Sequence, residues 1–161
     1  MAKLSAGIVL YRSVGDRRDD LEILAVHPGG PFWAKKDDGA WSIPKGEYGP
    51  DEEAVAVARR EFVEELGQPL PDGELIPLGE VRQSGGKRVT AWALELPPRS
   101  SFDVGAMVSN TFEMEWPPRS GQRQTFPEVD RAEWFGVDLA RRKLVAAQVD
   151  FVDELIRCWR A

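Results

Sequence analysis

The feature that most constrains the fold is an uninterrupted run between Asp51 and Gly67 that contains neither proline nor glycine. Pro50 and Asp51 stand directly before this run, where a carboxylate can cap the first free N–H groups of a helix. Gly67 closes the run, and glycine readily adopts the left-handed conformation that ends many helices. The sequence therefore predicts a helix from about Glu52 to Leu66.

One face of this predicted helix is apolar, and an acidic residue falls inside it. At about 100° per residue, one sector of the helix collects the side chains of Ala54, Val55, Ala58, Phe62 and Leu66. Glu65 falls between Ala54 and Ala58 on the same wheel. Burying an ionised carboxylate without a partner is costly. Glu65 is therefore expected to be protonated, paired with a cation such as Arg60, or bound to a metal ion.

Three carboxylates, those of Glu61, Glu64 and Glu65, crowd within five positions of this helix. Like charges at such spacing repel one another, and a hard divalent cation with oxygen ligands removes the repulsion. The other interpretation is an acidic, solvated helix face, because Arg59 and Arg60 stand close by. The helix pattern alone leaves both interpretations open.

The rest of the chain alternates short apolar runs with turns. The strands that this pattern predicts are 6–11, 21–26, 40–43, 74–83, 87–96, 109–116 and 132–137. Pro44-Lys45-Gly46 is expected to end a strand and open a turn. Ser84-Gly85-Gly86 should form a hairpin turn within a meander. A closing amphipathic helix is expected over Leu144 to Trp159, so the pattern predicts an α/β fold with a sheet sandwiched between helices.

The length and the net charge of the chain limit the functional classes to which it can belong. A chain of 161 residues fits one domain, expected here over residues 1–161. The formal charge of −6 argues against general binding to nucleic acid or to an anionic membrane. Cys158 is the only cysteine, and the apolar run near the N-terminus is too short for a signal peptide or a membrane span. A cytoplasmic protein is expected, and its oligomeric state is left open.

The segment from Gly46 to Gly67 reads GEYGPDEEAVAVARREFVEELG and resembles the Nudix box. Its charged and glycine positions are all filled: Gly46, Glu52, Arg60, Glu61, Glu64, Glu65 and Gly67. The pattern departs only at Gln68, where the box normally has an aliphatic residue. The resemblance implies an α/β/α sandwich, with a mixed β-sheet between helices, as a single Nudix hydrolase domain over residues 1–161.

The resemblance also implies a metal site. Glu61 and Glu65 would be the main ligands of Mg²⁺, with Mn²⁺ as the alternative ion. Glu64 would either join them or help to activate the attacking water. The backbone carbonyl of Lys45 is a further expected ligand. Bound magnesium would neutralise the charge of a diphosphate and lower the pKa of bound water.

Other residues receive catalytic roles from the same resemblance. Arg60 would orient the carboxylates through a bidentate ion pair, a geometry that suits its guanidinium group. Glu52 would accept such a contact or reach a metal ion through water. In nucleotide-sanitising members of the family a base stands in a loop before a late strand, which makes Glu128 the candidate here. Glu64 is the alternative base, and a solvated surface position is the other interpretation of Glu128.

Basic and aromatic residues provide candidate substrate contacts. Cations that could surround a polyphosphate, or simply aid solubility, are Lys35, Lys36, Lys45, Arg82, Lys87 and Arg88. Trp33 is equally consistent with stacking on a purine and with anchoring a loop. Core packing is expected for Trp41. A structural place at the end of a strand is expected for His27, which lacks the pattern of a metal site.

Pro44-Lys45-Gly46 resembles the start of the box in hydrolases of diadenosine polyphosphates. The resemblance therefore implies a magnesium-dependent hydrolase of a phosphoanhydride bond in nucleoside diphosphate-linked compounds. Dinucleoside polyphosphates of the diadenosine tetraphosphate type and nucleoside triphosphates are the expected substrates. The alternatives are a nucleotide-sugar or diphosphoinositol polyphosphate hydrolase and a catalytically silent nucleotide-binding module of the same fold.

Overall fold

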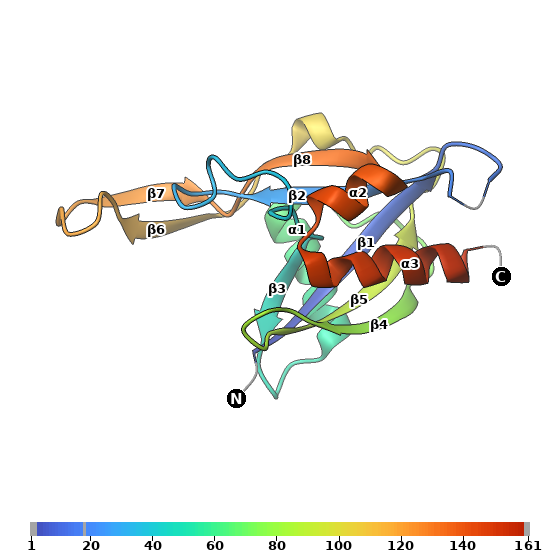
Figure 1. Cartoon of the computed structure of the whole chain (residues 1–161), viewed down its shortest axis with the longest axis horizontal. Helices are drawn as coiled ribbons and strands as arrows, with labels where there is room; N and C mark the ends of the chain where they lie inside the picture. The colour runs from blue at the N-terminus through green and yellow to red at the C-terminus, as the bar shows by residue number, and fades with distance from the viewer. Residues whose placement is uncertain (1–2, 18, 160–161) are drawn as a thin grey trace.

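The computed structural model describes residues 3–17 and 19–159, and its main element is a mixed sheet between helices (Figure 1). The strands of this sheet are β1 (Leu4–Ser13), β2 (Leu21–Pro28), β3 (Lys45–Tyr48), β4 (Ile76–Arg82), β5 (Arg88–Glu95) and β8 (Val129–Gly136). Helix α1 (Ala54–Leu66) covers one face, and α3 (Val149–Cys158) covers the other together with the short α2 (Val137–Lys143). The predicted α/β/α sandwich is confirmed.

Strand β1 is the centre of the sheet, whose order is β4-β5-β1-β2-β8. One edge of β1 pairs in parallel with β5 from Leu4 to Tyr11. The other edge is divided, because β3 pairs with its first half and β2 with its second half. Strands β2 and β3 therefore separate along β1, and this split positions the site described below.

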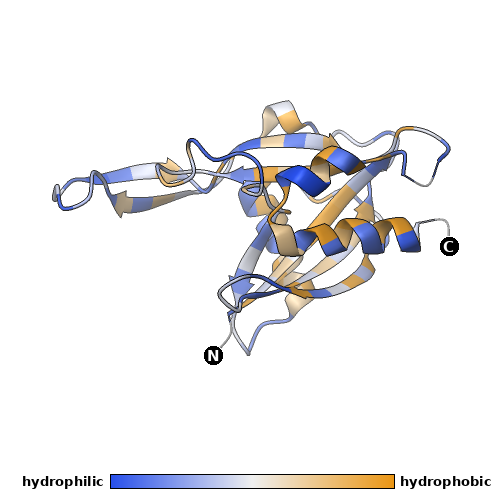
Figure 2. Ribbon diagram, viewed as in Figure 1, coloured by the Kyte–Doolittle hydropathy of each residue, from blue (hydrophilic) through white to orange (hydrophobic). Residues whose placement is uncertain are grey.

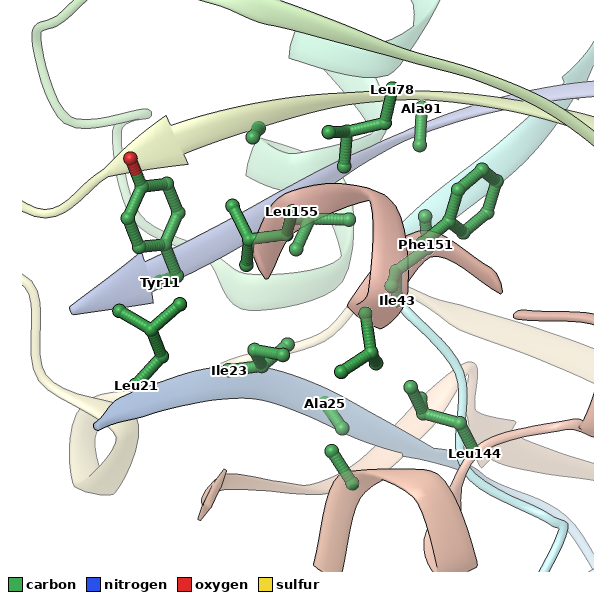
Figure 3. Close-up of a cluster of buried hydrophobic side chains, with 14 of the residues drawn as sticks. Tyr11, Leu21, Ile23, Ala25, Ile43, Leu78, Ala91, Leu144, Phe151 and Leu155 are labelled. Carbon is green, nitrogen blue, oxygen red and sulfur yellow. The ribbon is translucent and has the colours of Figure 1, made fainter. Parts of the chain in front are cut away.

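The side chains on the two faces of β1 belong to two separate hydrophobic cores. Ala6, Ile8 and Leu10 pack toward α1, whereas Val9 and Tyr11 belong to the core beneath α2 and α3. Figure 3 shows the second core, and Figure 2 shows the hydrophobic side of α3 that covers it. Burial on both faces explains why β1 reads as a nearly continuous apolar run.

Helix α1 begins later than the sequence predicted. Its first residue is Ala54, and the N-cap is Glu53 without a side-chain hydrogen bond, so the predicted cap by Asp51 is wrong. The Glu52 carboxylate instead accepts from the backbone N–H of Gly49 and holds a turn before the helix. The buried face contains Val57 in place of the expected Val55. The C-terminal end is as predicted, with Gly67 at φ 69°.

The segment before the helix also differs from the prediction. Lys45 and Gly46 do not open a turn but begin β3, which pairs with β1 so that Lys45 lies opposite Gly7. Residues 40–43 form only isolated bridges, such as that between Val26 and Ser42. A side chain at Gly7 would lie 2.5 Å from the carbonyl oxygen of Pro44, so glycine allows this close approach.

The predicted strand at 109–116 exists as β6 (Thr111–Glu115), but it does not continue the β4–β5 meander. It pairs with β7 (Arg123–Pro127), a strand that the sequence pattern does not predict. These two strands form a separate ribbon that extends away from the main sheet (Figure 1). Its residues are mostly exposed and polar, so β7 lacks the apolar run that usually marks a strand.

The C-terminal region is divided more finely than predicted. The expected strand at 132–137 is β8, which starts at Val129, and the expected helix at 144–159 is a 3₁₀ turn (Ala146–Gln148) followed by α3. Helix α2 was not predicted. Leu144 has an extended backbone and separates α2 from the 3₁₀ turn. Within residues 3–17 and 19–159, no helix is both long and apolar enough to cross a membrane.

Candidate active site

A pocket of about 400 Å³ opens where β2 and β3 separate, beside helix α1. The residues from the sequence-predicted site that line it are Lys45, Glu61, Glu64, Glu65, Lys87 and Glu128. They come from β3, α1, the β4–β5 hairpin and the β7–β8 junction, so residues distant in sequence meet here. Because Glu47 lines the pocket as well, five carboxylates and two ammonium groups share one cavity.

Glu65 is the most buried of these carboxylates. Burial raises the pKa of Glu65 to about 8, although the nearby Lys45 ammonium lowers it, and the charge of Glu61 raises it further. The backbone N–H of Lys45 donates to its Oε1 atom at 3.3 Å. Of the three environments expected for Glu65, pairing with Arg60 is not observed, because its charged neighbour is Lys45.

Glu61 reaches the pocket directly over Gly46 of β3. A Cβ atom at Gly46 would lie 1.9 Å from the carboxyl carbon of Glu61, so only glycine leaves room for this carboxylate. Burial and the charge of Glu64 raise the pKa of Glu61, whereas Arg60 lowers it. Glu64 therefore lies close enough for its charge to disfavour the ionised form of Glu61.

Arg60 connects several carboxylates at the edge of the pocket. Its Nη1 atom donates to Glu52 at 3.0 Å, and its guanidinium nitrogens lie 3.8 Å from Glu61 and 3.6 Å from Glu64. The expected bidentate pair is replaced by one hydrogen bond and two longer contacts. The N–H of Gly49 and the guanidinium of Arg60 lower the pKa of Glu52, which does not line the pocket.

Lys45 provides a largely desolvated cation within the pocket. Burial and the charge of Lys87 lower the pKa of the Lys45 ammonium, whereas Glu65, Glu47 and Glu61 raise it. Lys45 is thus a desolvated cation between a second ammonium and several carboxylates. An anionic group bound here would gain a strong interaction, because little water screens the charge.

Glu128 occupies the junction between β7 and β8 and lines the pocket across from α1. Its backbone is held on both sides, since its N–H donates to the carbonyl of Asn110 at 2.8 Å and its carbonyl accepts from Gly29 at 2.9 Å. The charge of Glu128 raises the pKa of both Glu61 and Glu65. The Glu128 side chain therefore lies close enough to the α1 carboxylates to influence their ionisation.

The other candidate substrate contacts do not line this pocket. Arg82 and Arg88 are exposed partners across the β4–β5 pair. Lys35 and Lys36 are exposed on the loop before β3. Trp33 keeps 38% of its surface exposed, with the Lys36 ammonium 5.0 Å from its ring centre, so it is not a buried anchor.

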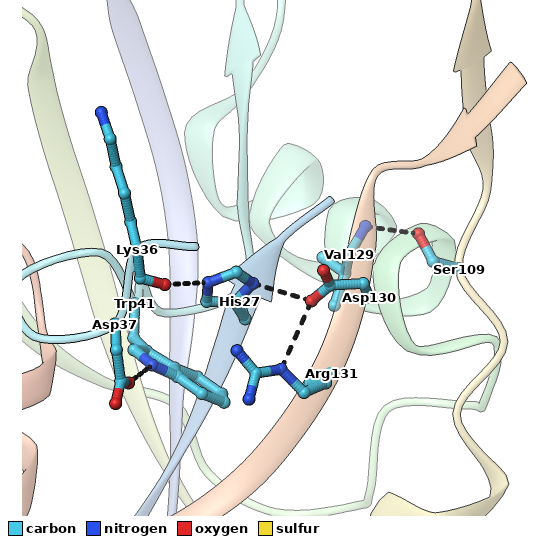
Figure 4. A network of polar contacts seen from close by, with 8 residues as sticks. All are labelled: His27, Lys36, Asp37, Trp41, Ser109, Val129, Asp130 and Arg131. Carbon is cyan, nitrogen blue, oxygen red and sulfur yellow. Dashed lines mark hydrogen bonds and ion pairs between the residues drawn. The ribbon is translucent and has the colours of Figure 1, made fainter. Parts of the chain in front are cut away.

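His27 links this loop to the strand that follows Glu128, as Figure 4 shows. Its Nδ1 atom lies 2.8 Å from an Asp130 oxygen and its Nε2 atom 2.6 Å from the carbonyl of Lys36. Trp41 packs edge-on against His27 and is 1% exposed. Both residues have the structural roles that the sequence predicted.

Sequence reasoning missed several pocket residues, among them Ser5, Ser42 and Asn110. Ser5 stands in the apolar first part of β1, where its hydroxyl is the only feature that distinguishes it from its neighbours. Asn110 lies just before β6, where no motif marks it. Their presence depends on the split between β2 and β3, which residue patterns do not reveal.

The chemistry of the pocket fits a hard divalent cation. Carboxylate oxygens are the ligands such ions prefer, and Gly46 leaves room for one of these carboxylates. Among residues 3–17 and 19–159, however, no three acidic, histidine or cysteine side chains already converge as ligands of one ion. Small side-chain rotations within the pocket would be needed to bring the carboxylates together.

In the presence of a chelator, the protein should lose stability as the pH rises. The raised pKa keeps a proton on Glu65 in the folded state up to about pH 8, whereas a solvent-exposed glutamate, with its ordinary pKa of 4.5, loses it near pH 4.5. The unfolded chain thus binds fewer protons between these values, so the stabilisation present below pH 4.5 is lost by about pH 8. Melting temperatures measured across this range should fall less steeply for Glu65→Gln. Parallel curves for the two proteins would contradict this assignment.

The fold and the carboxylate-rich pocket define the chain as an enzyme of the diphosphate hydrolase class. The NUDIX domain family model matches residues 1–155, so the chain belongs to the Nudix family. Hydrolases of this family generally use a divalent metal ion. No curated protein matches the sequence.

The solved structures that share the fold include the following three, all at low sequence identity. An Ap4A hydrolase of C. elegans in a binary complex is 20% identical, with 95% of this chain and 94% of that chain covered and a TM-score of 0.57. A mutT/nudix family protein from Listeria innocua is 18% identical, with coverages of 98% and 93% and a TM-score of 0.60. The NUDIX domain of Shewanella oneidensis NrtR, complexed with ADP ribose, is 16% identical, with coverages of 96% and 86% and a TM-score of 0.57.

Proposed function

We propose that this protein is a magnesium-dependent hydrolase of a phosphoanhydride bond in nucleoside diphosphate-linked compounds. The observation that carries the proposal is the shared pocket of Glu61, Glu64, Glu65 and Glu128 with the desolvated Lys45. Carboxylates suit the cation, and an ammonium group suits a phosphate. Dinucleoside polyphosphates of the diadenosine tetraphosphate type and nucleoside triphosphates are the proposed substrates.

Glu61 and Glu65 are the proposed main ligands of Mg²⁺ or Mn²⁺, with Glu64 and the backbone carbonyl of Lys45 completing the set. When bound, the cation neutralises phosphate charge and lowers the pKa of water. Burial and the repulsion from neighbouring carboxylates raise the pKa of Glu61 and Glu65, and a bound cation would offset both effects. This relief of repulsion explains why one helix keeps so many carboxylates.

The remaining roles in hydrolysis are proposed for the protein's own side chains. Glu128 is the proposed general base, which accepts a proton from the attacking water while its backbone is held by Asn110 and Gly29. Lys45 orients a phosphate and offsets negative charge that develops on the leaving group. Arg60, fixed by Glu52, keeps Glu64 directed along the helix edge.

Replacing Glu128 by Gln should lower kcat by roughly 10²- to 10⁴-fold, the usual contribution of a general base. The amide keeps the shape of the side chain but cannot accept the proton. Steady-state kinetics at saturating magnesium measures the effect. Glu133→Gln is the matched control, because Glu133 is exposed on β8 and does not line the pocket. Unchanged turnover in Glu128→Gln would place the base elsewhere, with Glu64 as the next candidate.

A substrate panel tests the function itself. Release of phosphate or pyrophosphate is measured with magnesium, and again with a chelator, from diadenosine tetraphosphate, nucleoside triphosphates, nucleotide sugars and a diphosphoinositol polyphosphate. Activity on the first two classes is expected. Likeness to a domain complexed with ADP ribose makes nucleotide sugars the second candidate. Absence of magnesium-dependent hydrolysis across the panel would overturn the proposal and favour a silent nucleotide-binding module.

A further inference from the structure

Ser5 presents an unsatisfied hydroxyl to the pocket. The residue is 1% exposed, it lines the cavity, and its Oγ atom has no hydrogen-bond partner among the described residues. An unpaired buried polar group destabilises the folded state. Alanine at this position would avoid that cost. The hydroxyl is therefore an unused hydrogen-bonding group in the wall of the pocket.

Cations gather at the same end of the pocket. Ser5 lies opposite Glu47 in the β1–β3 pair, and Lys87 precedes β5, whose first residue Arg88 lies opposite Leu4. The ammonium groups of Lys3 and Lys87 lie 3.8 and 3.9 Å from the Glu47 carboxylate. Two ammonium groups thus face one carboxylate at this end, although only that of Lys87 belongs to a lining residue, and Lys45 lies near both Lys87 and the α1 carboxylates. The charge of this end is opposite to that of the α1 end.

We propose that Ser5 and Lys87 form a subsite for a further phosphate group, beyond the diphosphate that is cleaved. The inference rests on the proposed function, because the α1 carboxylates and their cation hold the reacting diphosphate. Lys45 lies between the two ends of the pocket, so its ammonium group would interact with phosphates at both. The enzyme would thus select compounds with three or more consecutive phosphates over those with two.

The chemistry of the subsite matches a phosphate better than a base or a ribose. Phosphate oxygens can accept from a hydroxyl and from an ammonium group, and neither Ser5 nor Lys87 offers an aromatic face. Lys87 keeps 27% of its side chain exposed, so it can turn from Glu47 toward a bound anion. Glu47 would then remain paired with Lys3.

Binding of two non-hydrolysable analogues tests the subsite. Methylene-bridged adenosine diphosphate and its bis-methylene triphosphate counterpart differ by one phosphate, and calorimetry in magnesium gives the affinity of each. Ser5→Ala and Lys87→Ala should each weaken triphosphate binding about tenfold or more, the usual effect of losing a hydrogen bond to a charged group. Binding of the diphosphate analogue should change less than twofold.

The control variant is Arg59→Ala, which removes the same charge as Lys87→Ala from an exposed position outside the pocket. Its affinities should match those of the wild type. Ser5→Ala should melt at the same temperature as the wild type or higher, because it removes a hydroxyl without a partner. Equal weakening of both analogues, or no weakening of either, would overturn the subsite.

The outcomes separate this inference from the proposed function. If diphosphate compounds are hydrolysed but neither variant discriminates between the analogues, the subsite is wrong and the function stands. If nothing is hydrolysed while the triphosphate analogue still binds through Ser5 and Lys87, the function is wrong and the subsite stands.

Discussion

Glu65→Gln should lower kcat roughly a thousandfold or more at saturating magnesium. Each tenfold loss corresponds to about 1.4 kcal/mol of activation free energy, and cation catalysis contributes several kcal/mol. An amide oxygen is a weaker ligand than a carboxylate, so the cation would be lost or misplaced. Initial rates on the preferred substrate of the panel measure the loss.

The same substitution should act on stability in the opposite direction when metal is removed. The wild-type protein buries a carboxylate whose pKa is raised to about 8, and glutamine has no charge to bury. With chelator above about pH 8, Glu65→Gln should therefore melt at a higher temperature than the wild type. With magnesium the order should reverse, because only the wild type gains from ion binding. Glu53→Gln, at an exposed position that forms no side-chain cap, is the control.

Gly46→Ala should reduce activity about a hundredfold or more and leave most of the stability intact. The new Cβ atom would occupy the place of the Glu61 carboxyl group, 1.9 Å away, and the flexible end of that side chain would have to move. Displacement of a metal ligand lowers activity, whereas the β3 backbone has no positive φ at this position that would resist alanine. Kinetics and thermal melting of the same preparation measure both effects.

Gly49→Ala is the matched control for this substitution. A Cβ atom at Gly49 would meet no atom within 4 Å, so activity should stay close to that of the wild type. If Gly46→Ala retained full activity, the position of Glu61 over β3 would have no catalytic importance. If it unfolded the protein, Gly46 would serve the fold and not the carboxylate.

Local patterns predicted the elements whose signals lie within a few residues. The apolar positions and Gly67 located the end of α1, and the aliphatic runs located β1 and β2. Turn chemistry identified the β4–β5 hairpin, where the N–H of Gln83 donates to the carbonyl of Lys87. In each case the sequence signal that predicts the element lies within the element itself.

Features that depend on distant contacts were not predictable in this way. Strand β7 forms only by pairing with β6, and its own residues are exposed and polar. Gln148 is fully buried because it accepts from the N–H of Ile43 and donates to Ser42 and Gln83. This hydrogen-bond network joins three parts of the chain, and no local spacing of residues predicts it.

The same distinction between local and distant signals applies to the residues of the candidate site. The α1 carboxylates were identified because their spacing and the family resemblance lie in one segment, and all three line the pocket. The substrate contacts chosen by charge alone, such as Arg82 and Arg88, lie outside it. Ser5 was missed because its importance comes from the cavity that the divided edge of β1 creates.

Direct titration with Mn²⁺, followed by the loss of its free-ion paramagnetic resonance signal, tests the central claim that the α1 carboxylates share a divalent cation. The wild type and Glu53→Gln should bind the ion saturably, whereas Glu61→Gln and Glu65→Gln should bind it at least tenfold more weakly. Magnesium should displace the bound Mn²⁺. Equal binding by all four proteins, or no binding by the wild type, would contradict the account.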